Sequence, residues 1–348
     1  MMRTSLIIFC LYISSALSID PFTAGPYDVE HNHISSELGW LGGELDHNLE
    51  VFTPTTPGQF PLVIFFPGLA CTTSAAVYSR VLARVASWGY AVVGPWAALY
   101  NPITTYKAEW VDVVLQWMKT NLSPGKQAEF GIRDGVVIDF ENLFLGAQSS
   151  GSHVAVNYLA LNDGCSSVHG MFLLSPVDGV DPFGIISEVC IDPPDMLNFQ
   201  VPALILAGGL DSLSGMDGLG NLFPPCAPEE FANERFYNAL TGPTVLINTT
   251  QYGHLDCVDD DFYNLMATLH LCATNRDTDK DIYRDYVAGE IVAFLRYFGQ
   301  ADCEMGSLMT DIVMEDIEGW VQHKGGVKET CGQDTCKWQE SPFSFIRL

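Results

Sequence analysis

A candidate nucleophile lies where a short apolar run gives way to a segment with helical periodicity. Residues 147–151 read Ala-Gln-Ser-Ser-Gly, so small residues stand two positions before and two positions after Ser149. A tight turn between a strand and a helix requires such small flanks, and it presents the serine hydroxyl for attack on a carbonyl carbon. The alternative is that Ser149 is a helix N-cap, but the strand–turn–helix context favours the nucleophile.

A nucleophilic serine needs a general base, which we expect late in the chain. His254 ends the sequence Gln-Tyr-Gly-His, which follows the apolar run 244–247, and this places the imidazole at a strand end. None of the other histidines is placed in this way at the end of an expected strand. Some precede the apolar runs, one lies inside a helical pattern and one lies near the C-terminus. His254 is therefore the predicted base.

Two aspartates compete for the role of the acid that orients this histidine. Asp211 ends the apolar segment 201–211, and Asp178 follows the preceding apolar run 171–174. The chain order Ser, Asp, His and the strand-end position favour Asp211. Asp178 stays as the alternative acid, although an aspartate in a turn is ordinarily only a turn former.

The same chemistry needs two backbone N–H groups that stabilise the oxyanion of the tetrahedral intermediate. Ser150, directly after the nucleophile, is one expected donor. Leu69 is the other, because it lies in the loop after the apolar run 61–66, where Gly68 permits a close backbone approach.

The sequence predicts neither a metal nor an organic cofactor. Four aspartates follow the histidine, at positions 256 and 259–261, but their spacing is not that of a calcium-binding EF-hand loop. We therefore expect a solvated acidic loop. No CxxC or HExxH spacing and no GxGxxG after the first apolar run occur in the chain.

Short apolar runs that alternate with amphipathic segments must position these residues. Such a pattern indicates a parallel sheet covered by helices on both faces, and thus an α/β fold. The segment 19–60 resembles an entry hairpin, and 301–348 has weak periodicity and is expected to be an appended extension of a domain spanning 19–300. The expected strands lie at 61–66, 90–94, 143–146, 171–174, 203–207 and 244–247, and the expected helices at 74–89, 110–118, 153–161 and 286–297.

The composition excludes several classes of protein. The 348 residues carry a formal net charge of −26, with 48% hydrophobic and 17% charged residues. That apolar content excludes a disordered acidic tail. The excess of carboxylates disfavours nucleic acids and anionic membranes as partners, because both are bound through clustered cations.

The first eighteen residues have the pattern of a secretory signal peptide. Arg3 provides the positive charge, 6–13 is a short apolar stretch, and 16–18 (Ala-Leu-Ser) is a cleavage site. No other stretch approaches eighteen consecutive apolar residues, so we expect a secreted mature chain without a transmembrane segment. Secretion permits disulfides, of which Cys331–Cys336 is the expected local pair, and glycosylation at the sequons of Asn121 and Asn248.

Several segments together resemble the chlorophyllases, which are α/β-hydrolases that cleave the phytyl ester of chlorophyll. The resemblance extends over about residues 45–300 and implies the α/β-hydrolase fold, a serine ester hydrolase and an apolar ester as substrate. The segments that carry it are 77–90, Asn-Leu-Phe-Pro-Pro-Cys-Ala-Pro at 221–228, 231–237, Tyr-Gly-His-Leu-Asp with Asp-Asp-Asp at 252–261, and 286–295.

The chain departs from the chlorophyllase pattern at two positions. In the family, the tight turn that carries the nucleophilic serine, called the nucleophile elbow, usually reads GHSRGG. Residues 147–152 of this chain read Ala-Gln-Ser-Ser-Gly-Ser. The family's acid usually begins an Asp-Pro-Val segment, where this chain has Ser175. The resemblance therefore supports Ser149 and His254, and it moves the acid role to Asp211 or Asp178.

These observations predict a secreted serine ester hydrolase that cleaves chlorophyll to chlorophyllide and phytol. A broad carboxylesterase or lipase for long-chain esters is the alternative within enzymes. A non-catalytic binding protein with the same fold is the alternative outside them, and the altered elbow and displaced acid are its support.

Overall fold

One mostly parallel sheet organises the protein. The computed structural model describes residues 20–35, 47–97, 109–161, 168–179, 189–215, 224–302, 304–306, 309 and 321–324. Within these residues, nine strands pair in the order β1-β2-β4-β3-β5-β6-β7-β8-β9. They are β1 (Val29–Ile34), β2 (Asn48–Pro54), β3 (Gly58–Phe66), β4 (Ala91–Trp96), β5 (Val136–Gln148), β6 (Val168–Leu174), β7 (Ala203–Gly208), β8 (Thr244–Thr249) and β9 (Val321–Lys324).

The predicted parallel arrangement is confirmed for the centre of the sheet. The strands from β4 through β3 and β5 to β8 pair parallel. At one edge β1 and β2 pair antiparallel, and β2 pairs antiparallel with β4, in agreement with the expected entry hairpin. At the other edge β9 pairs antiparallel with β8.

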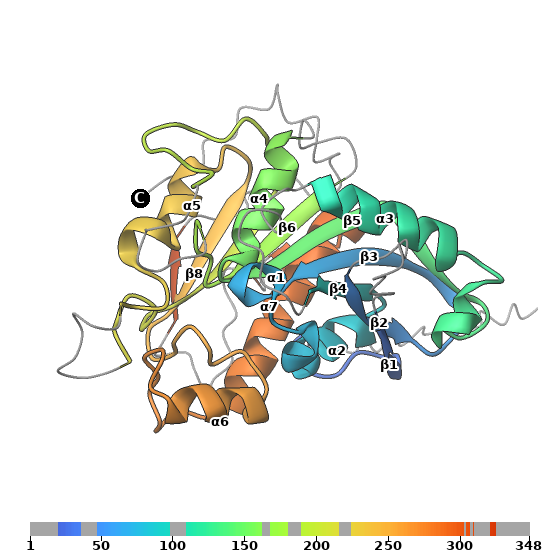
Figure 1. Cartoon of the computed structure of the whole chain (residues 1–348), viewed down its shortest axis with the longest axis horizontal. Coiled ribbons are helices and arrows are strands. Elements are labelled where there is room, and N and C mark those ends of the chain that lie inside the picture. The colour runs from blue at the N-terminus through green and yellow to red at the C-terminus, as the bar shows by residue number, and fades with distance from the viewer. Residues whose placement is uncertain are drawn as a thin grey trace, which may run out of the picture.

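Helices cover both faces of this sheet (Figure 1). Side chains of α3 and α4 pack in one apolar cluster with Leu62 and Ile64 of β3, and side chains of α2 and α7 pack in another with Val63 and Phe65. Alternate residues of one strand thus enter two cores, which is why the run is apolar without a break. The helices are α1 (Gly68–Cys71), α2 (Ser79–Ser87), α3 (Glu109–Asn121), α4 (Gly151–Leu161), α5 (Glu234–Ala239), α6 (Asp260–Thr268) and α7 (Lys280–Gln300), with 3₁₀ turns η1 (Ala75–Tyr78), η2 (Gln127–Phe130) and η3 (Glu229–Phe231).

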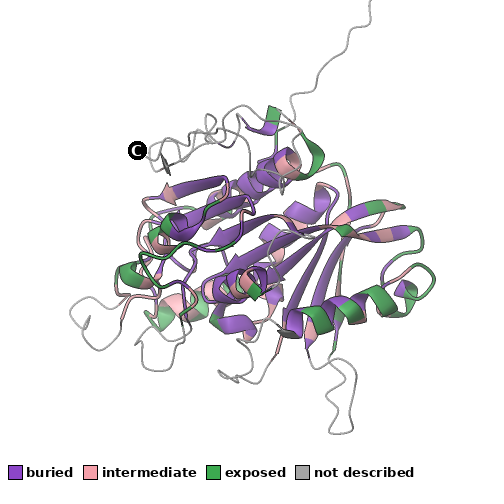
Figure 2. Cartoon of the chain, turned by 90° about the horizontal axis from the view of Figure 1, so that it is seen from above, coloured by how far each residue is buried: buried purple, intermediate pink, exposed green. Residues whose placement is uncertain are grey.

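Burial follows the apolar periodicity of the sequence (Figure 2). The predicted apolar faces of α2 and α3 are buried, and the strands of the centre are buried almost throughout. Each fully buried Val, Leu or Phe contributes about 1.5–3 kcal/mol to the free energy of unfolding. This rigid centre carries the loops at the carboxyl ends of the parallel strands.

Part of the expected C-terminal extension belongs to the sheet. Val321–Lys324 forms β9, and Met305 and Met309 are buried beside α7. The expected signal peptide, residues 1–18, and the expected pair Cys331–Cys336 lie outside the described residues. Among the described residues, no helix has both the length and the apolar character needed to cross a membrane.

Candidate active site

Ser149 occupies a sharp turn between β5 and α4. Its φ of 54° is left-handed, a conformation that costs a residue with a side chain about 1–2 kcal/mol. Hydrogen bonds hold it there: Ser149 N–H donates to Leu174 O, and Val177 N–H donates to Ser149 O. At Gly151 a Cβ atom would lie 2.2 Å from Phe66 O, so the small residue of the motif is required by the close approach of β3. The turn thus has the geometry of a nucleophile elbow.

His254 lies against this serine. Its Nε2 atom is 2.8 Å from Ser149 Oγ, and its carbonyl oxygen accepts a hydrogen bond from the Gln148 side chain at 3.0 Å. Burial lowers the pKa of the imidazole to about 4. The ring is therefore neutral near pH 7, as a general base must be before it takes a proton.

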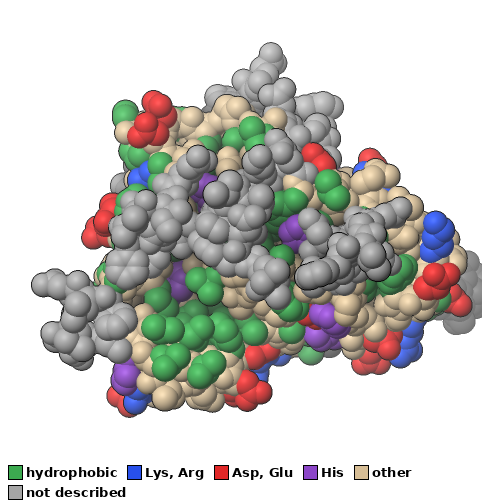
Figure 3. All heavy atoms as spheres, in the orientation of Figure 1, with side chains coloured by type: hydrophobic (Ala, Val, Ile, Leu, Met, Phe, Trp, Pro, Cys, Tyr) green, Lys and Arg blue, Asp and Glu red, His purple; other side chains and the backbone are tan. Residues whose placement is uncertain are grey.

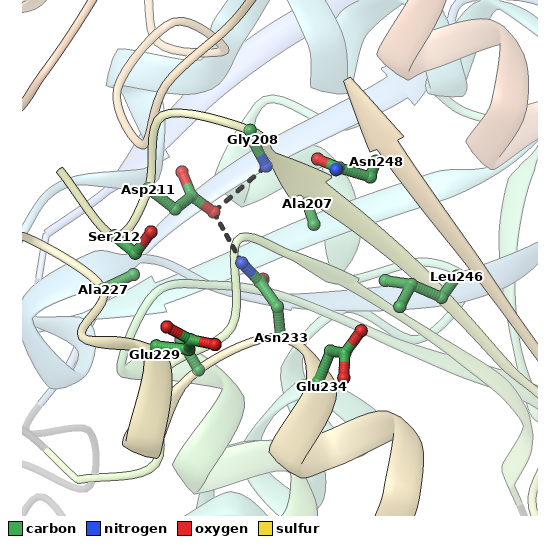
Figure 4. A pocket seen from close by; sticks show the side chains of 12 residues that line it. Ala207, Gly208, Asp211, Ser212, Ala227, Glu229, Asn233, Glu234, Leu246 and Asn248 are labelled. Atoms are coloured by element: carbon green, nitrogen blue, oxygen red, sulfur yellow. Dashed lines mark hydrogen bonds between the residues drawn. The ribbon is translucent and has the colours of Figure 1, made fainter. Parts of the chain in front are cut away.

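Asp211 faces the other side of the imidazole. Its Oδ1 atom lies 4.0 Å from His254 Nδ1, and its Oδ2 atom accepts hydrogen bonds from Gly208 N–H at 3.0 Å and from Asn233 Nδ2 at 2.9 Å (Figure 4). The Ser175 hydroxyl also bonds to this carboxyl group. Burial raises the pKa of Asp211 to about 7, although these hydrogen bonds oppose the rise.

The alternative acid, Asp178, is engaged elsewhere. It is 2% exposed, its Oδ1 atom lies 3.0 Å from His153 Nδ1, and its Oδ2 atom accepts from Ile191 N–H and from Arg235 Nε. Burial works to raise the pKa of Asp178, but hydrogen bonds from His153 and Cys190 outweigh it and hold the pKa below the ordinary value. Asp211, and not Asp178, is thus the aspartate next to His254.

The loop expected to supply a second oxyanion donor is tied to the elbow. Leu69 and Ala70 have left-handed φ values of 52° and 51°. Ala70 N–H donates to the Ser150 hydroxyl at 2.7 Å, and Gly68 N–H donates to the Tyr78 hydroxyl at 3.2 Å. The Tyr78 hydroxyl in turn donates to the Gln148 side chain. The side chains of Tyr78 and Gln148 were not singled out in the sequence, because their contact spans 70 positions.

A cavity of about 270 Å³ lies behind Asp211, between the ends of β7 and β8 and the segment that leads into α5. Asp211, Asn233 and Asn248 line it together with Glu229 and Glu234 (Figure 4). Neither Ser149 nor His254 is among the described residues of its lining. Within the described residues, the cavity therefore borders the Asp211 side chain and does not reach Ser149.

Comparison with known proteins now decides the family. The family model described as Chlorophyllase matches residues 17–317. The chain belongs to the chlorophyllase family. Chlorophyllase-2 of Arabidopsis thaliana is 25% identical over 283 residues, which cover 79% of this chain and 84% of that protein. Chlorophyllase-1 of the same plant is 26% identical over 257 residues, covering 72% and 75%. The protein named "Chlorophyllase-1, chloroplastic" of Citrus unshiu is 25% identical over 266 residues, covering 74% of each chain.

Membership in the chlorophyllase family establishes the α/β-hydrolase fold and implies a hydrolase that acts on esters. The departure at Ser175 gains a structural meaning in this context. Ser175 follows β6 with a φ of 42° and bonds to Asp211, which follows β7. Where chlorophyllases usually carry an acid, this chain carries a hydroxyl that contacts an acid from the neighbouring strand.

The acidic segment of this chlorophyllase-family chain is only partly solvated. Asp260 and Asp261 are exposed, as expected. The expectation is wrong for Asp256, which is fully buried and accepts hydrogen bonds from Gly253 N–H at 2.8 Å and Thr274 Oγ1 at 2.6 Å. Lys280, whose Nζ atom lies 3.5 Å from Asp256 Oδ2, compensates its charge. Asp256 thereby closes the turn that carries His254.

A disulfide that the sequence left open joins two loops of the site. Cys226 and Cys272 are bonded across 46 positions. Cys226 follows the loop of Asp211, and Cys272 follows α6 in the segment after His254. An isolated bridge between Ser214 and Cys272 reinforces the same contact. The two loops are therefore fixed relative to each other.

Proposed function

We propose that this protein is a serine ester hydrolase whose catalytic residues are Ser149, His254 and Asp211. The observation that carries the proposal is the distance of 2.8 Å between Ser149 Oγ and His254 Nε2, in an elbow whose serine is left-handed. A buried neutral imidazole next to a strained, fixed hydroxyl is the arrangement that acyl transfer to serine requires.

The proposed reaction proceeds in two halves. Ser149 Oγ attacks the ester carbonyl carbon while its proton passes to His254 Nε2. The C–O bond to the alcohol then breaks, and the imidazolium returns that proton to the leaving oxygen. A water molecule loses a proton to His254 and attacks the acyl-enzyme, and the proton goes back to Ser149 as the acid leaves. Asp211 stabilises the imidazolium in both halves.

Backbone N–H groups of Leu69 and Ser150 are the proposed oxyanion donors. Support comes from the hydrogen bond between Ala70 N–H and Ser150 Oγ, which holds the two donor segments against each other. Because the donors are backbone groups, substituting the Leu69 side chain should change binding more than catalysis.

Chlorophyll, or a related pigment ester, is the proposed substrate. Family membership supports an ester substrate, and exposed leucines near the site suit an apolar one. Leu69, which is 53% exposed, lies in the oxyanion loop, and Leu213, which is 52% exposed, lies two positions after Asp211. Leu265 and Leu269 are exposed in and after α6, and hydrophobic side chains gather on the face near this helix (Figure 3). Such a surface favours a long apolar alcohol or acyl chain.

A broad carboxylesterase or lipase is the second candidate. The observation that favours it is the pair of departures from chlorophyllases, at the elbow and at Ser175. A non-catalytic binding protein is disfavoured, because such a protein has no use for a buried serine–histidine pair at hydrogen-bond distance.

We further propose that the chain is secreted, with residues 1–18 as its signal peptide and 19–300 as the main part of its hydrolase domain. The Cys226–Cys272 disulfide supports an oxidising compartment. Two Citrus relatives are named chloroplastic, so the compartment needs a direct test. N-terminal sequencing of the mature protein from its native source distinguishes the two routes: a start after Ser18 supports secretion.

One preparation assayed on two substrates tests the proposed substrate. Hydrolysis of chlorophyll a is compared with that of p-nitrophenyl butyrate, with Ser149→Ala as the control for both. The proposal expects hydrolysis of both that the control lacks. High activity on the small ester without activity on chlorophyll establishes the broad esterase instead.

A further inference from the structure

We propose that His153, Asp178 and Cys190 form a binding site for Zn²⁺ next to the elbow helix α4. His153 lies in the first turn of α4, Asp178 lies in the turn after β6, and Cys190 comes from the segment that precedes β7. An imidazole, a carboxylate and a thiolate are the three ligand types that zinc takes in proteins. Their separations of 25 and 12 positions explain why no zinc motif is visible in the sequence.

The three ligand atoms already converge. His153 Nδ1 and Cys190 Sγ each lie 3.0 Å from Asp178 Oδ1, and all three atoms lie within 4.8 Å of one another. Tetrahedral zinc with bonds of about 2.0–2.3 Å requires ligand atoms about 3.3–3.6 Å apart. The two separations of 3.0 Å would have to lengthen by about half an ångström, and the separation of His153 Nδ1 from Cys190 Sγ, which is at most 4.8 Å, would have to shorten by up to about 1.3 Å.

The surroundings suit a ligand set of this kind. Asp178 Oδ2, the oxygen that would not bind the metal, accepts from Ile191 N–H at 3.0 Å and Arg235 Nε at 2.9 Å. The Asn157 side chain lies 3.4 Å from His153 Nε2, one helical turn away. Hydrogen bonds to the remaining atoms of metal ligands fix their orientation and raise affinity. The hydrogen bonds to Asp178 Oδ2 are in place, and the Asn157 side chain lies within reach of His153 Nε2.

Charge and protons balance in the proposed site. The carboxylate of Asp178 and the thiolate of Cys190 neutralise Zn²⁺, and Arg235 remains paired with Oδ2. Cys190 releases one proton to solvent as the metal binds, while the His153 proton moves from Nδ1 to Nε2, where the Asn157 amide oxygen is within reach after a flip. His153 and Asp178 are buried and Cys190 is half-buried. With three protein ligands, a water molecule would complete the tetrahedral coordination.

Such a metal would join three parts of the chain around the elbow without touching a reacting atom. Ser149 precedes His153 by one helical turn, and Val177, which donates to Ser149 O, directly precedes Asp178. Zinc would therefore cross-link three chain segments next to the nucleophile elbow. Its binding free energy would add to the stability of the folded chain.

Metal binding to the full chain tests this inference. Protein stripped with a chelator is titrated with Zn²⁺ alone, and bound metal is measured by mass spectrometry and thermal stability by melting. We expect one equivalent of zinc, a raised Tm, and loss of about 100-fold in affinity in Cys190→Ala. Asn157→Ala, which removes only the outer contact, should lose about 10-fold.

Two controls keep the outcome decisive. His31 and His33 both contact Glu50 and so offer another possible metal-binding group, and a double change of these histidines to Asn should leave zinc binding intact. Alkylation of wild-type protein, mapped by mass spectrometry, covers the case that Cys190→Ala fails to fold. Zinc should slow the alkylation of Cys190, whereas the slow alkylation of the free and buried Cys257 should be the same with and without zinc. No stoichiometric zinc, binding that the His31 and His33 changes abolish, or alkylation of Cys190 unaffected by zinc overturns the proposal.

Discussion

His254 Nδ1 and Asp211 Oδ1 face each other at 4.0 Å, and neither atom has a hydrogen-bond partner among the described residues. This distance exceeds that of a hydrogen bond. Both atoms are buried, so each is costly to leave unsatisfied, and a shift of about 1 Å would pair them. Catalytic hydrogen bonds are often long before substrate binds, and we expect this one to shorten as the imidazolium forms.

The first prediction separates the two aspartates by activity. Asp211→Asn should lower kcat on p-nitrophenyl butyrate by about 10⁴-fold, because an amide can neither stabilise the imidazolium nor hold the productive tautomer. Circular dichroism should be unchanged. A decrease in kcat of less than about tenfold in this variant would show that Asp211 is not one of the catalytic residues.

Asp178→Asn is the matched comparison. It removes the charge that His153 and Arg235 contact and should lower the free energy of unfolding by about 3–5 kcal/mol. The fraction that stays folded should keep most of its kcat, since the structure brings Asp178 to His153 and not to His254. An intact melting curve with lost turnover would reverse the two assignments.

The second prediction concerns pH. In the proposed mechanism, the enzyme is catalytically active when His254 is neutral and Asp211 is ionised. Burial lowers the pKa of His254 to about 4 and raises that of Asp211 to about 7, so the acid limb of activity should follow Asp211. We expect kcat/KM to rise about tenfold per pH unit below about pH 7 and to level off above it, with an apparent pKa that belongs to the pair. A rise already complete near pH 5 would contradict this.

A third prediction assigns Ser175 a positioning role. Its hydroxyl lowers the pKa of Asp211, so Ser175→Ala should move the acid limb of the pH profile upward. We expect kcat near pH 7 to fall about threefold to tenfold, with KM unchanged, because one hydrogen bond to a charged group is worth about 1.5 kcal/mol. Ser212→Ala, one position after Asp211 and exposed, is the control. Identical pH profiles for Ser175→Ala and wild type would leave Ser175 without this role.

A fourth prediction concerns a carboxyl group outside the site. Glu290 of α7 is fully buried, and burial raises its pKa well above the ordinary value of 4.5. A raised pKa in the folded state means that the native protein binds the proton more tightly, so this contribution to stability is present at low pH and is lost as pH rises through the folded pKa. Glu290→Gln should therefore raise Tm at neutral and alkaline pH, by an amount that shrinks as the pH falls toward 4.5 and vanishes below it.

Glu141→Gln, at an exposed position of β5, provides the baseline for that comparison. It should change Tm little at any pH. A Glu290→Gln variant that melts below wild type at about pH 8 would show that the carboxylate makes a contact worth more than its burial costs.

The centre of the sheet was predictable from sequence for a physical reason. Strands such as β3 and β7 are buried on both faces, and an unbroken apolar run is the signature of that environment. The elements outside the centre have no such signal. Val321–Lys324 is four residues long and mostly polar, and α6 buries none of its residues, so neither leaves a periodic pattern.

The site was predictable where it depends on chain order and unpredictable where it depends on pairing. Ser149 and His254 stand at strand ends, and the sequence places them there directly. Asp256 looked like one charge in a solvated acidic run, because its compensation by Lys280 and Thr274 comes from residues 24 and 18 positions further along the chain. Pairing of Cys226 with Cys272 likewise requires the tertiary arrangement of two loops.

The central claim is that Ser149 is a nucleophile activated by His254, and a fluorophosphonate probe tests it most directly. Folded wild-type protein should bind one equivalent of probe, and peptide mapping should place the label on Ser149. Ser149→Ala and His254→Ala, with unchanged circular dichroism, should take up none on the same timescale. Absence of labelling in folded wild type, or labelling at another residue that survives Ser149→Ala, would contradict the account.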